Sequence, residues 1–386
     1  MPSRRHVLAL LAASPFLNAC GAGDLPDPVA GWREPGAAEA DPRRFGLAHA
    51  ILAPNPHNTQ PWLVELRGED EMLLYCDLDR RLPFTDPLDR QITIGCGAFL
   101  YLYWTALIQR GFVCQFEFFP EGAPAPGARL DDRPLALVRT RQVENAQPER
   151  EYYYAQILAR RTNREPFEVQ VPSDDSLRRL AAATTDWYQP GAQALTADWR
   201  NDLERVTQLR DLVWRGFDRE LRTAGAQEET YGWLRFGRTE RARTPDGLFV
   251  DVPMPGVLRT LGMLDKADIV DPDSDASKRA AEDWRRKIDT APAFIWFSTA
   301  DDAPLTRLIA GMAYARMNLA ATADGMALHP WSQTLQEYAE MADLYAEAKM
   351  LLGVDASKTV QMLARVGYAA PVEPAARRAL DQFVRA

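Results

Sequence analysis

The sequence is poor in the residues on which disulfide frameworks and metal sites depend. It has four cysteines and four histidines in 386 residues. If Cys20 is modified as described below, Cys76, Cys96 and Cys114 remain, and an odd number without a Cys-x-x-Cys pair favours buried thiols. The histidines lack metal-type spacing, so we expect no zinc site. Walker loops and Gly-x-Ser-x-Gly elbows are also missing from the sequence.

One acidic run partly matches a calcium-binding loop. Asp271, Asp273, Asp275 and Glu282 occupy positions 1, 3, 5 and 12 of that pattern, but Ala276 stands where the sharp turn requires glycine. The acidic N-terminus of a helix beginning near residue 276 explains the same residues. We therefore expect no bound metal.

Positive charge and long apolar runs are scarce as well. The chain has 45 basic and 54 acidic residues, a net charge of -9, so it has no general electrostatic route onto nucleic acid. The longest apolar run beyond the N-terminus, Ile94–Ile108, has 15 residues, whereas a membrane-spanning helix needs about 20. With 46% hydrophobic residues, the composition is that of a globular protein with a sizeable core. The length indicates two or three domains, or one duplicated fold.

The N-terminus has the composition of an export signal. Arg4 and Arg5 precede an apolar stretch, and the sequence around them resembles a twin-arginine signal. Leu17–Cys20 resembles a bacterial lipobox, whose cysteine carries the lipid. We predict a signal at 1–19, lipidation of Cys20 and a flexible tether at 20–45. The alternative is a basic, apolar N-terminus that is cleaved elsewhere.

Two stretches of the chain share one order of elements. In each, an apolar strand precedes a helix, a glycine ends the helix, and further strands follow. The helices begin at Gly97 and Gly311 and end before Gly111 and Gly325, each pair of glycines being 14 residues apart. This pattern predicts a duplicated unit of mixed helix and strand.

We place the first unit at 46–150 and the second at 151–386. The second unit carries an insertion at about 222–256, a segment broken by glycine and proline and containing several aromatic residues. This insertion is either a lid over a pocket or a surface excursion docked by its aromatic side chains.

Two short motifs have the chemistry of a binding site. Ala53–Trp62 is dense in amide side chains, which can hydrogen-bond to the edge of a heteroaromatic ring. Arg160-Arg161-Thr162-Asn163-Arg164 places three guanidinium groups within five residues at a helix end, a spacing that suits a phosphate. Taken alone, such an arginine triplet is usually a solvated helix face.

Together with Leu82–Pro87, Arg90 and Cys96-Gly97, these motifs resemble the nitroreductase superfamily, most closely its Acg-like FMN-binding branch. The resemblance implies an α+β fold in which two nitroreductase-like units are fused in tandem as an intramolecular pseudo-dimer. It also implies a monomer with FMN between the units and hydride transfer through the flavin N5. Because neither motif occurs a second time in the required place, we expect one FMN per chain.

The resemblance also assigns roles to residues. The flavin phosphate would lie on Arg160 and Arg164, the isoalloxazine against the 54–58 loop, and the 330–333 segment opposite the flavin N5. No catalytic side chain is implied, because the flavin carries the chemistry. The complete set of expected FMN-binding residues is Pro54, Asn55, Pro56, Asn58, Gln60, Arg160, Arg161, Thr162, Arg164, Pro330, Trp331, Ser332, Gln333, Arg377 and Arg378.

Export and flavin reduction are difficult to reconcile. The predicted signal would place the protein on the periplasmic side of a bacterial inner membrane or in the cell envelope, where free NAD(P)H is not expected. The sequence therefore leaves the electron donor and the small-molecule substrate open, with a membrane quinol or a protein donor among the alternatives. Two other hypotheses also remain: a protein that sequesters FMN without turnover, and a structural descendant without cofactor.

Overall fold

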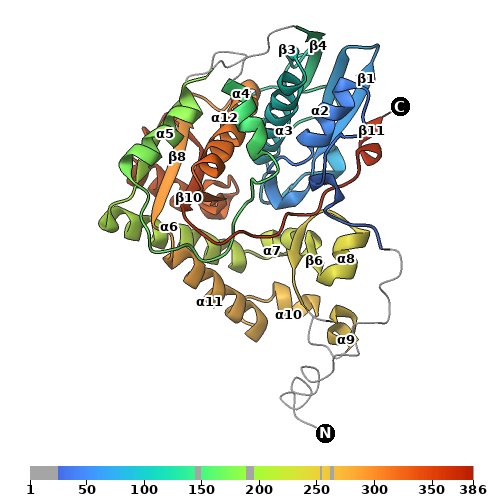
Figure 1. Cartoon of the computed structure of the whole chain (residues 1–386). Coiled ribbons are helices and arrows are strands. Elements are labelled where there is room, and N and C mark those ends of the chain that lie inside the picture. Colours follow the sequence, from blue (N-terminus) through green and yellow to red (C-terminus); the bar gives the residue numbers. More distant parts are fainter. Residues whose placement is uncertain (1–24, 144–148, 188–194, 253, 261–264, 386) are drawn as a thin grey trace.

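The computed structural model describes residues 25–143, 149–187, 195–252, 254–260 and 265–385. The predicted signal and Cys20 lie outside these ranges. The described elements form two sheets, each packed against one long apolar helix, with further helices around them (Figure 1). The architecture is α+β, as expected.

The two larger sheets have the same strand order and the same antiparallel pairing. In the first sheet the order is β1 (Trp62–Arg67), β2 (Glu71–Cys76), β4 (Ala136–Gln142) and β3 (Phe112–Phe118). In the second it is β5 (Leu195–Arg200), β8 (Ala293–Thr299), β10 (Thr359–Gly367) and β9 (Ala327–Pro330). The long helices α3 (Arg90–Gln109) and α12 (Pro304–Ala323) occupy equivalent places after β2 and β8.

The remaining elements surround these two sheets. The helices of the first half are η1 (Ala30–Trp32), α2 (Pro42–Ala50), η2 (Pro56–Asn58), η3 (Leu78–Arg80), and then α4 (Glu149–Gln156). The second half adds α5 (Asp174–Thr185), α6 (Leu203–Arg222), α9 (Pro255–Thr260), α10 (Lys266–Val270), α11 (Asp275–Asp289), η4 (Gln333–Leu335), η5 (Ala339–Met341), α13 (Ala342–Leu352) and η6 (Leu380–Gln382). The insertion consists of α7 (Ala224–Gly232), β6 (Leu234–Phe236), α8 (Gly237–Arg243) and β7 (Leu248–Val250).

Helices α3 and α12 pack side by side through a reciprocal glycine contact at the centre of the molecule (Figure 1). A Cβ atom on Gly97 would overlap the Leu308 carbonyl oxygen and lie 3.0 Å from the Gly311 Cα. A Cβ atom on Gly311 would overlap the Ile94 carbonyl oxygen. Since Leu308 precedes Gly311 by three residues and Ile94 precedes Gly97 by three, each helix presents the same surface to the other. Such reciprocity is the geometry of a two-fold interface.

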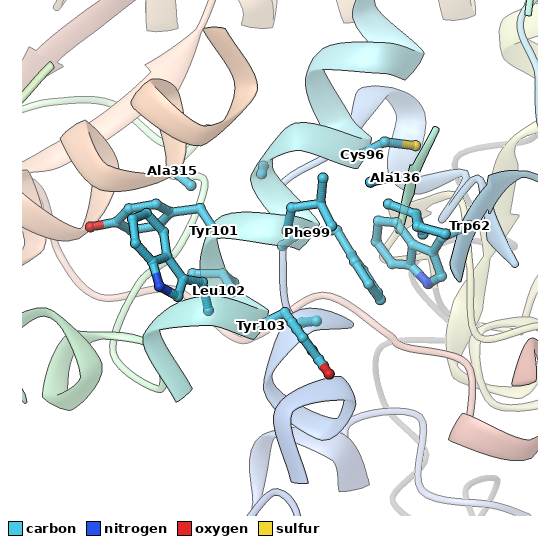
Figure 2. Close-up of a cluster of buried hydrophobic side chains, with 14 of the residues drawn as sticks. Trp62, Cys96, Phe99, Tyr101, Leu102, Tyr103, Ala136 and Ala315 are labelled. Carbon is cyan, nitrogen blue, oxygen red and sulfur yellow. The ribbon is translucent and has the colours of Figure 1, made fainter. Parts of the chain in front are cut away.

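The core of the first half is built on α3. Its residues Phe99, Tyr101 and Tyr103 point in different directions from the helix, toward β1, toward α12 and toward α2 (Figure 2). The Phe99 and Trp62 rings lie 4.9 Å apart between centroids. Among the described helices, α3 alone has the length and composition of a membrane span, but 94% of its apolar window is buried within the protein. The burial indicates a core helix.

The structure corrects the tether expected at 20–45. From residue 25 onward this segment is packed against the body, and the indole of Trp32 is only 7% exposed. Asp41 caps α2 by accepting a hydrogen bond from the Arg43 amide. The Gly- and Pro-rich composition suggested a solvated chain, but Trp32 packs into the core and Pro28 accepts a hydrogen bond from the Arg377 amide.

Strand β5 and the C-terminal strand were not predicted. Residues 198–200 belong to β5, and α6 begins only after the N-cap Asp202. Strand β11 (Val384–Arg385), at the end of the second predicted unit, pairs in parallel with β1 of the first sheet. In Figure 1 the C-terminal segment crosses the molecule to reach this position. Both strands depend on partners distant in sequence, which local patterns do not reveal.

We expect Gly97→Ala and Gly311→Ala each to destabilise the protein by about 3 kcal/mol or more, because the added methyl group meets backbone that cannot move aside independently. The free energy of unfolding in urea measures the effect. Gly232→Ala is the matched control, since its Cβ would have no neighbour within 4 Å. Equal stabilities for the three variants would contradict the tight helix contact.

Candidate functional site

The arginine motif, the 54–60 loop and the C-terminal segment meet at the end of α2. The Arg160 Nη2 donates to the Leu52 carbonyl at 2.9 Å, and the Arg377 Nε donates to the Ile51 carbonyl at 2.6 Å. The Arg377 Nη2 also donates to the carbonyls of Leu52 and Ala53, both at 3.1 Å. These three carbonyls belong to the turn that follows α2, and the guanidinium groups satisfy main-chain acceptors that would otherwise be buried without a hydrogen bond.

The positive charge at this place has no acidic counterpart. Within the described ranges, no carboxylate forms an ion pair with Arg160, Arg161, Arg164 or Arg377. Three of their buried nitrogens, Nε and Nη1 of Arg160 and Nε of Arg161, have no hydrogen-bond partner there. We call these four residues the arginine cluster. Buried cations without partners are costly, so the cluster is a candidate site for an anion.

Burial lowers the pKa of each guanidinium group in the arginine cluster. It lowers the pKa of Arg160 to about 10 and lowers the pKa of Arg164. The pKa of Arg377 is held well below its usual range, first by burial and then by repulsion from Arg160, Arg161 and Arg164. Because a guanidinium group keeps its proton in proteins, all four side chains carry positive charge at neutral pH. A bound anion would supply the charge that the protein itself does not.

Two histidines flank Arg164. Burial, together with repulsion from Arg164, lowers the pKa of His57 to about 4 and that of His329 well below its ordinary value. Both imidazoles are therefore neutral at pH 7. The Arg365 Nε donates to the His329 Nδ1 at 3.1 Å, which leaves the His329 proton on Nε2. His329 lies in β9 and pairs with Arg365 of β10, whereas His57 lies in the 54–60 loop. The surroundings of Arg164 therefore include the loop before β1 and the second sheet.

The loop before β1 has an unusual backbone. His57, Asn58 and Gln60 have positive φ angles of 47°, 53° and 53°. The Asn55 Oδ1 accepts from the Gln60 amide at 2.8 Å, and Pro56 opens the short helix η2. Gly95 of α3 approaches this turn closely, since its Cβ would lie 3.1 Å from the Asn55 Cβ. Such strained conformations persist only where the surroundings hold them in place.

The amides of Asn58 and Gln60 do not have the role expected for them. The Asn58 Nδ2 donates to the carbonyls of Gly247 and Ala376, while its Oδ1 accepts from Arg377 at 2.8 Å. The Gln60 Nε2 donates to the Pro245 carbonyl, and its Oε1 accepts from the Arg378 amide, both at 2.8 Å.

These side chains therefore bind the insertion and the C-terminal segment to the loop and are not free to meet a ring edge. His57 adds a contact to the insertion, with its Nε2 lying 3.1 Å from the Thr230 Oγ1. The sequence pattern identified amide-rich chemistry correctly but could not show that main-chain groups from distant segments would use it.

Arg378 lies apart from the arginine cluster. Its Nη2 donates to the Gln60 carbonyl at 2.6 Å, and its Nη1 lies 3.7 Å from the Asp77 carboxylate. It lines a surface depression of about 400 Å³ together with Arg80, Arg235 and Asp246. A second depression, of about 290 Å³, lies between residues 34–37 and α4. Neither depression is lined by the arginine cluster.

The 330–333 segment is fixed by the second sheet and by α6. The Trp331 amide donates to the Leu363 carbonyl at 2.7 Å, and its indole donates to the Val213 carbonyl at 2.9 Å. The Trp331 amide is therefore already occupied. Pro330 pairs with Ala364, Ser332 caps η4, and Gln333 opens it.

Glu220 of α6, a buried carboxyl group near this segment, was not anticipated from the sequence. Its exposed fraction is 6%, and it accepts hydrogen bonds from Gln336 and Gln333. The described surroundings provide no cation for it, and burial raises its pKa to about 7. Tyr314 of α12 was also not anticipated. Burial raises the pKa of this phenol to about 12, although Arg160 and Arg164 oppose the shift.

Comparison with known proteins gives relatives along most of the chain. No family model matches the sequence. The chain is 29% identical over 352 residues to "Putative NAD(P)H nitroreductase Rv3131" of Mycobacterium tuberculosis, covering 90% of this chain and 92% of that one. It is also 29% identical over 161 residues to "Putative NAD(P)H nitroreductase acg" of the same organism, covering 42% and 46%.

Solved structures give a more distant similarity. A nitroreductase with bound FMN from Desulfitobacterium hafniense is 17% identical, covering 61% of this chain and 98% of that one, with a TM-score of 0.35. The resemblance to the nitroreductase superfamily is therefore supported mainly by the sequence relatives, the first of which extends over nine-tenths of the chain.

We expect Glu220→Gln to change the pH dependence of stability. The folded-state pKa of about 7 exceeds the ordinary value of 4.5, so the wild-type protein is most stable with Glu220 protonated and loses stability as pH rises from 4.5 to 7. The loss amounts to roughly 3 kcal/mol. Unfolding in urea between pH 5 and 8 should give a smaller decline for Glu220→Gln than for wild type. The exposed Glu204→Gln, on the same helix, should follow the wild type, and parallel curves for all three proteins would contradict the assignment.

Proposed function

We propose that this protein is a nitroreductase-like, FMN-dependent oxidoreductase. The observation that carries the proposal is the arginine cluster at the point where the motifs of the sequence converge. Arg160 and Arg377 are buried, Arg161 and Arg164 are half-buried, and the cluster is cationic with no ion-pair partner among the described carboxylates. The NAD(P)H nitroreductase names of the relatives agree with this reading.

The residues of the cluster fit the phosphate end of FMN. Arg160 offers two buried N–H groups without partners, and Arg161 offers a third. Arg164 and Thr162 are half-buried in the same segment, and Arg377 is oriented by Asn58. A phosphate dianion would compensate the charge of these guanidinium groups and accept several charge-assisted hydrogen bonds.

When bound, FMN supplies hydride transfer through its N5 atom. The protein contributes position and exclusion of water. The insertion covers the 54–60 loop through contacts at His57, Asn58 and Gln60, so this side of the site is closed by protein. His57 and His329 are neutral at pH 7 and therefore add no further positive charge to the cluster.

We further propose that the two halves form an intramolecular pseudo-dimer with one FMN between them. The order of four strands that the two sheets share and the reciprocal contact of Gly97 and Gly311 support a fused two-fold arrangement. The arginine motif occurs once, at 160–164, and the loop motif once, at 54–60, so the chain provides one complete set.

Export and lipid attachment through Cys20 remain part of the proposal. They would place the flavoprotein at a membrane surface, where an electron donor other than free NAD(P)H is required. A lipid-soluble quinol and a protein donor are the two classes that this location makes accessible.

We expect Arg160→Ala to weaken FMN binding at least tenfold. A charge-assisted hydrogen bond to phosphate is worth roughly 1.5 to 3 kcal/mol, and each 1.4 kcal/mol corresponds to a factor of ten. Quenching of flavin fluorescence on titration of the apoprotein gives the affinity. Arg205→Ala, an exposed arginine of α6, is the control and should bind FMN as wild type does. An unchanged FMN affinity in Arg160→Ala would contradict the assignment of the flavin phosphate to this cluster.

Titration should also give one FMN per monomeric chain. Flavin absorbance of the reconstituted protein, combined with its mass from light scattering, measures both quantities. Two flavins per chain, or binding only after dimerisation, would overturn the pseudo-dimer. Reduction tests turnover: flavin that dithionite reduces, but that neither NADPH nor a quinol reduces, would favour the sequestering protein over the enzyme. A colourless protein that binds no added FMN would reject both.

A further inference from the structure

The N-terminal segment before α2 lies directly on the arginine cluster. The Trp32 ring faces three guanidinium groups, with the Cζ atoms of Arg161, Arg377 and Arg160 at 4.5, 5.3 and 5.8 Å from the ring centroid. The indole N–H donates to the Ala375 carbonyl at 2.8 Å. The Arg377 amide donates to the Pro28 carbonyl at 2.9 Å. Segments more than 340 residues apart are thus joined around the cluster.

The packing leaves little space between these segments. A Cβ atom on Gly31 would lie 3.2 Å from the Ile51 side chain and 3.8 Å from the Arg377 Cβ. Trp32 also belongs to the main hydrophobic core of the first half. Its position is therefore fixed from both sides, by the core and by hydrogen bonds to the C-terminal segment.

The Trp32 ring interacts favourably with guanidinium groups that have no carboxylate partner. The negative face of an indole attracts a guanidinium group without neutralising it, so the group keeps its charge and its N–H donors for another partner. A carboxylate in the same place would occupy those donors and repel an incoming anion. An aromatic residue instead orients the guanidinium groups and leaves the site anion-selective.

We propose that Trp32 is a positioning residue of the anion site, and that the segment 25–33 forms one wall of it. The ring orients Arg160 and Arg161, whose buried N–H groups without partners would meet the bound phosphate. Arg377 contributes its charge, since its own N–H groups already donate to main-chain carbonyls and to Asn58. As applied to FMN, this inference rests on the proposed function. As applied to an inorganic phosphate anion, it rests on the cluster alone.

A positioning role for Trp32 predicts that its replacement affects the binding of FMN and of riboflavin differently. FMN and riboflavin share the isoalloxazine ring and differ in the phosphate, so a residue that acts through the guanidinium groups affects only FMN. We expect Trp32→Leu to weaken FMN binding about tenfold and to leave riboflavin binding unchanged. Trp32→Phe should restore most of the FMN affinity because it keeps an aromatic face.

The experiment measures dissociation constants for FMN, riboflavin and inorganic phosphate in the wild-type protein and in both variants. Trp214→Leu is the control, since this half-buried tryptophan of α6 stacks on Phe217, away from the cluster. Circular dichroism establishes that each variant is folded. A purely structural role for Trp32 would weaken FMN and riboflavin alike, and that result would overturn the proposal, as would an unchanged FMN affinity.

A second measurement applies if Trp32→Leu fails to fold. Arg33, which is exposed, is a trypsin site within the segment. Because ligand binding and docking of the segment are coupled, saturating FMN or phosphate should slow cleavage at Arg33 in the wild-type protein. An unchanged cleavage rate in the presence of bound ligand would overturn the proposal.

The two proposals can fail separately. If the wild-type protein binds neither flavin but inorganic phosphate protects Arg33, the FMN assignment fails and the anion site with its N-terminal wall stands. If FMN binds with the same dissociation constant to Trp32→Leu and to wild type, the proposed function stands and the proposed role of Trp32 fails. If phosphate and FMN both leave cleavage and stability unchanged, both proposals fail.

Discussion

The contact between α3 and α12 is the constraint on which the rest of the molecule depends. Two glycines allow the helix backbones to approach until each meets the carbonyl groups of the other. The sheets packed against these helices are thereby held in fixed positions relative to each other. Segments from both halves then meet beside the helices: Tyr314 of α12 interacts with Arg160 and Arg164, and Gly95 of α3 approaches the 54–60 loop.

The candidate site is a consequence of charge that the fold leaves unbalanced. The protein is acidic overall, and most of its arginines form ion pairs or hydrogen bonds to carboxylates at the surface. In the arginine cluster, main-chain carbonyls that follow α2, a tryptophan ring and the side-chain oxygen of an asparagine take the place of carboxylates. Carbonyls and rings hold cations without cancelling their charge. A site built in this way is unfavourable by itself and becomes favourable with an anion.

The loop at 54–60 has a different task from the one its composition suggested. Its amides bind the insertion and the C-terminal segment, and three of its residues adopt positive φ angles to do so. The loop, the insertion and both ends of the described chain therefore form one connected assembly around the cluster. Arg377 contacts three of these segments at once. Its guanidinium group donates to the Ile51 carbonyl after α2 and to the Asn58 side chain of the loop, and it faces the Trp32 ring of the N-terminal segment.

The sequence by itself determined the composition class, the repeated order of elements, and the motifs at 54–62 and 160–164. These features are local: periodic burial, helix-ending glycines and closely spaced arginines can be recognised within a few turns of chain. The tertiary structure alone decided which donors remain free, that Arg378 stands apart from Arg377, and that Trp32, Tyr314 and His329 lie beside the cluster. It also added β5 and β11. Hydrogen-bond partners, burial and cancellation of charge depend on segments brought together from distant positions, and no local pattern encodes which groups will meet.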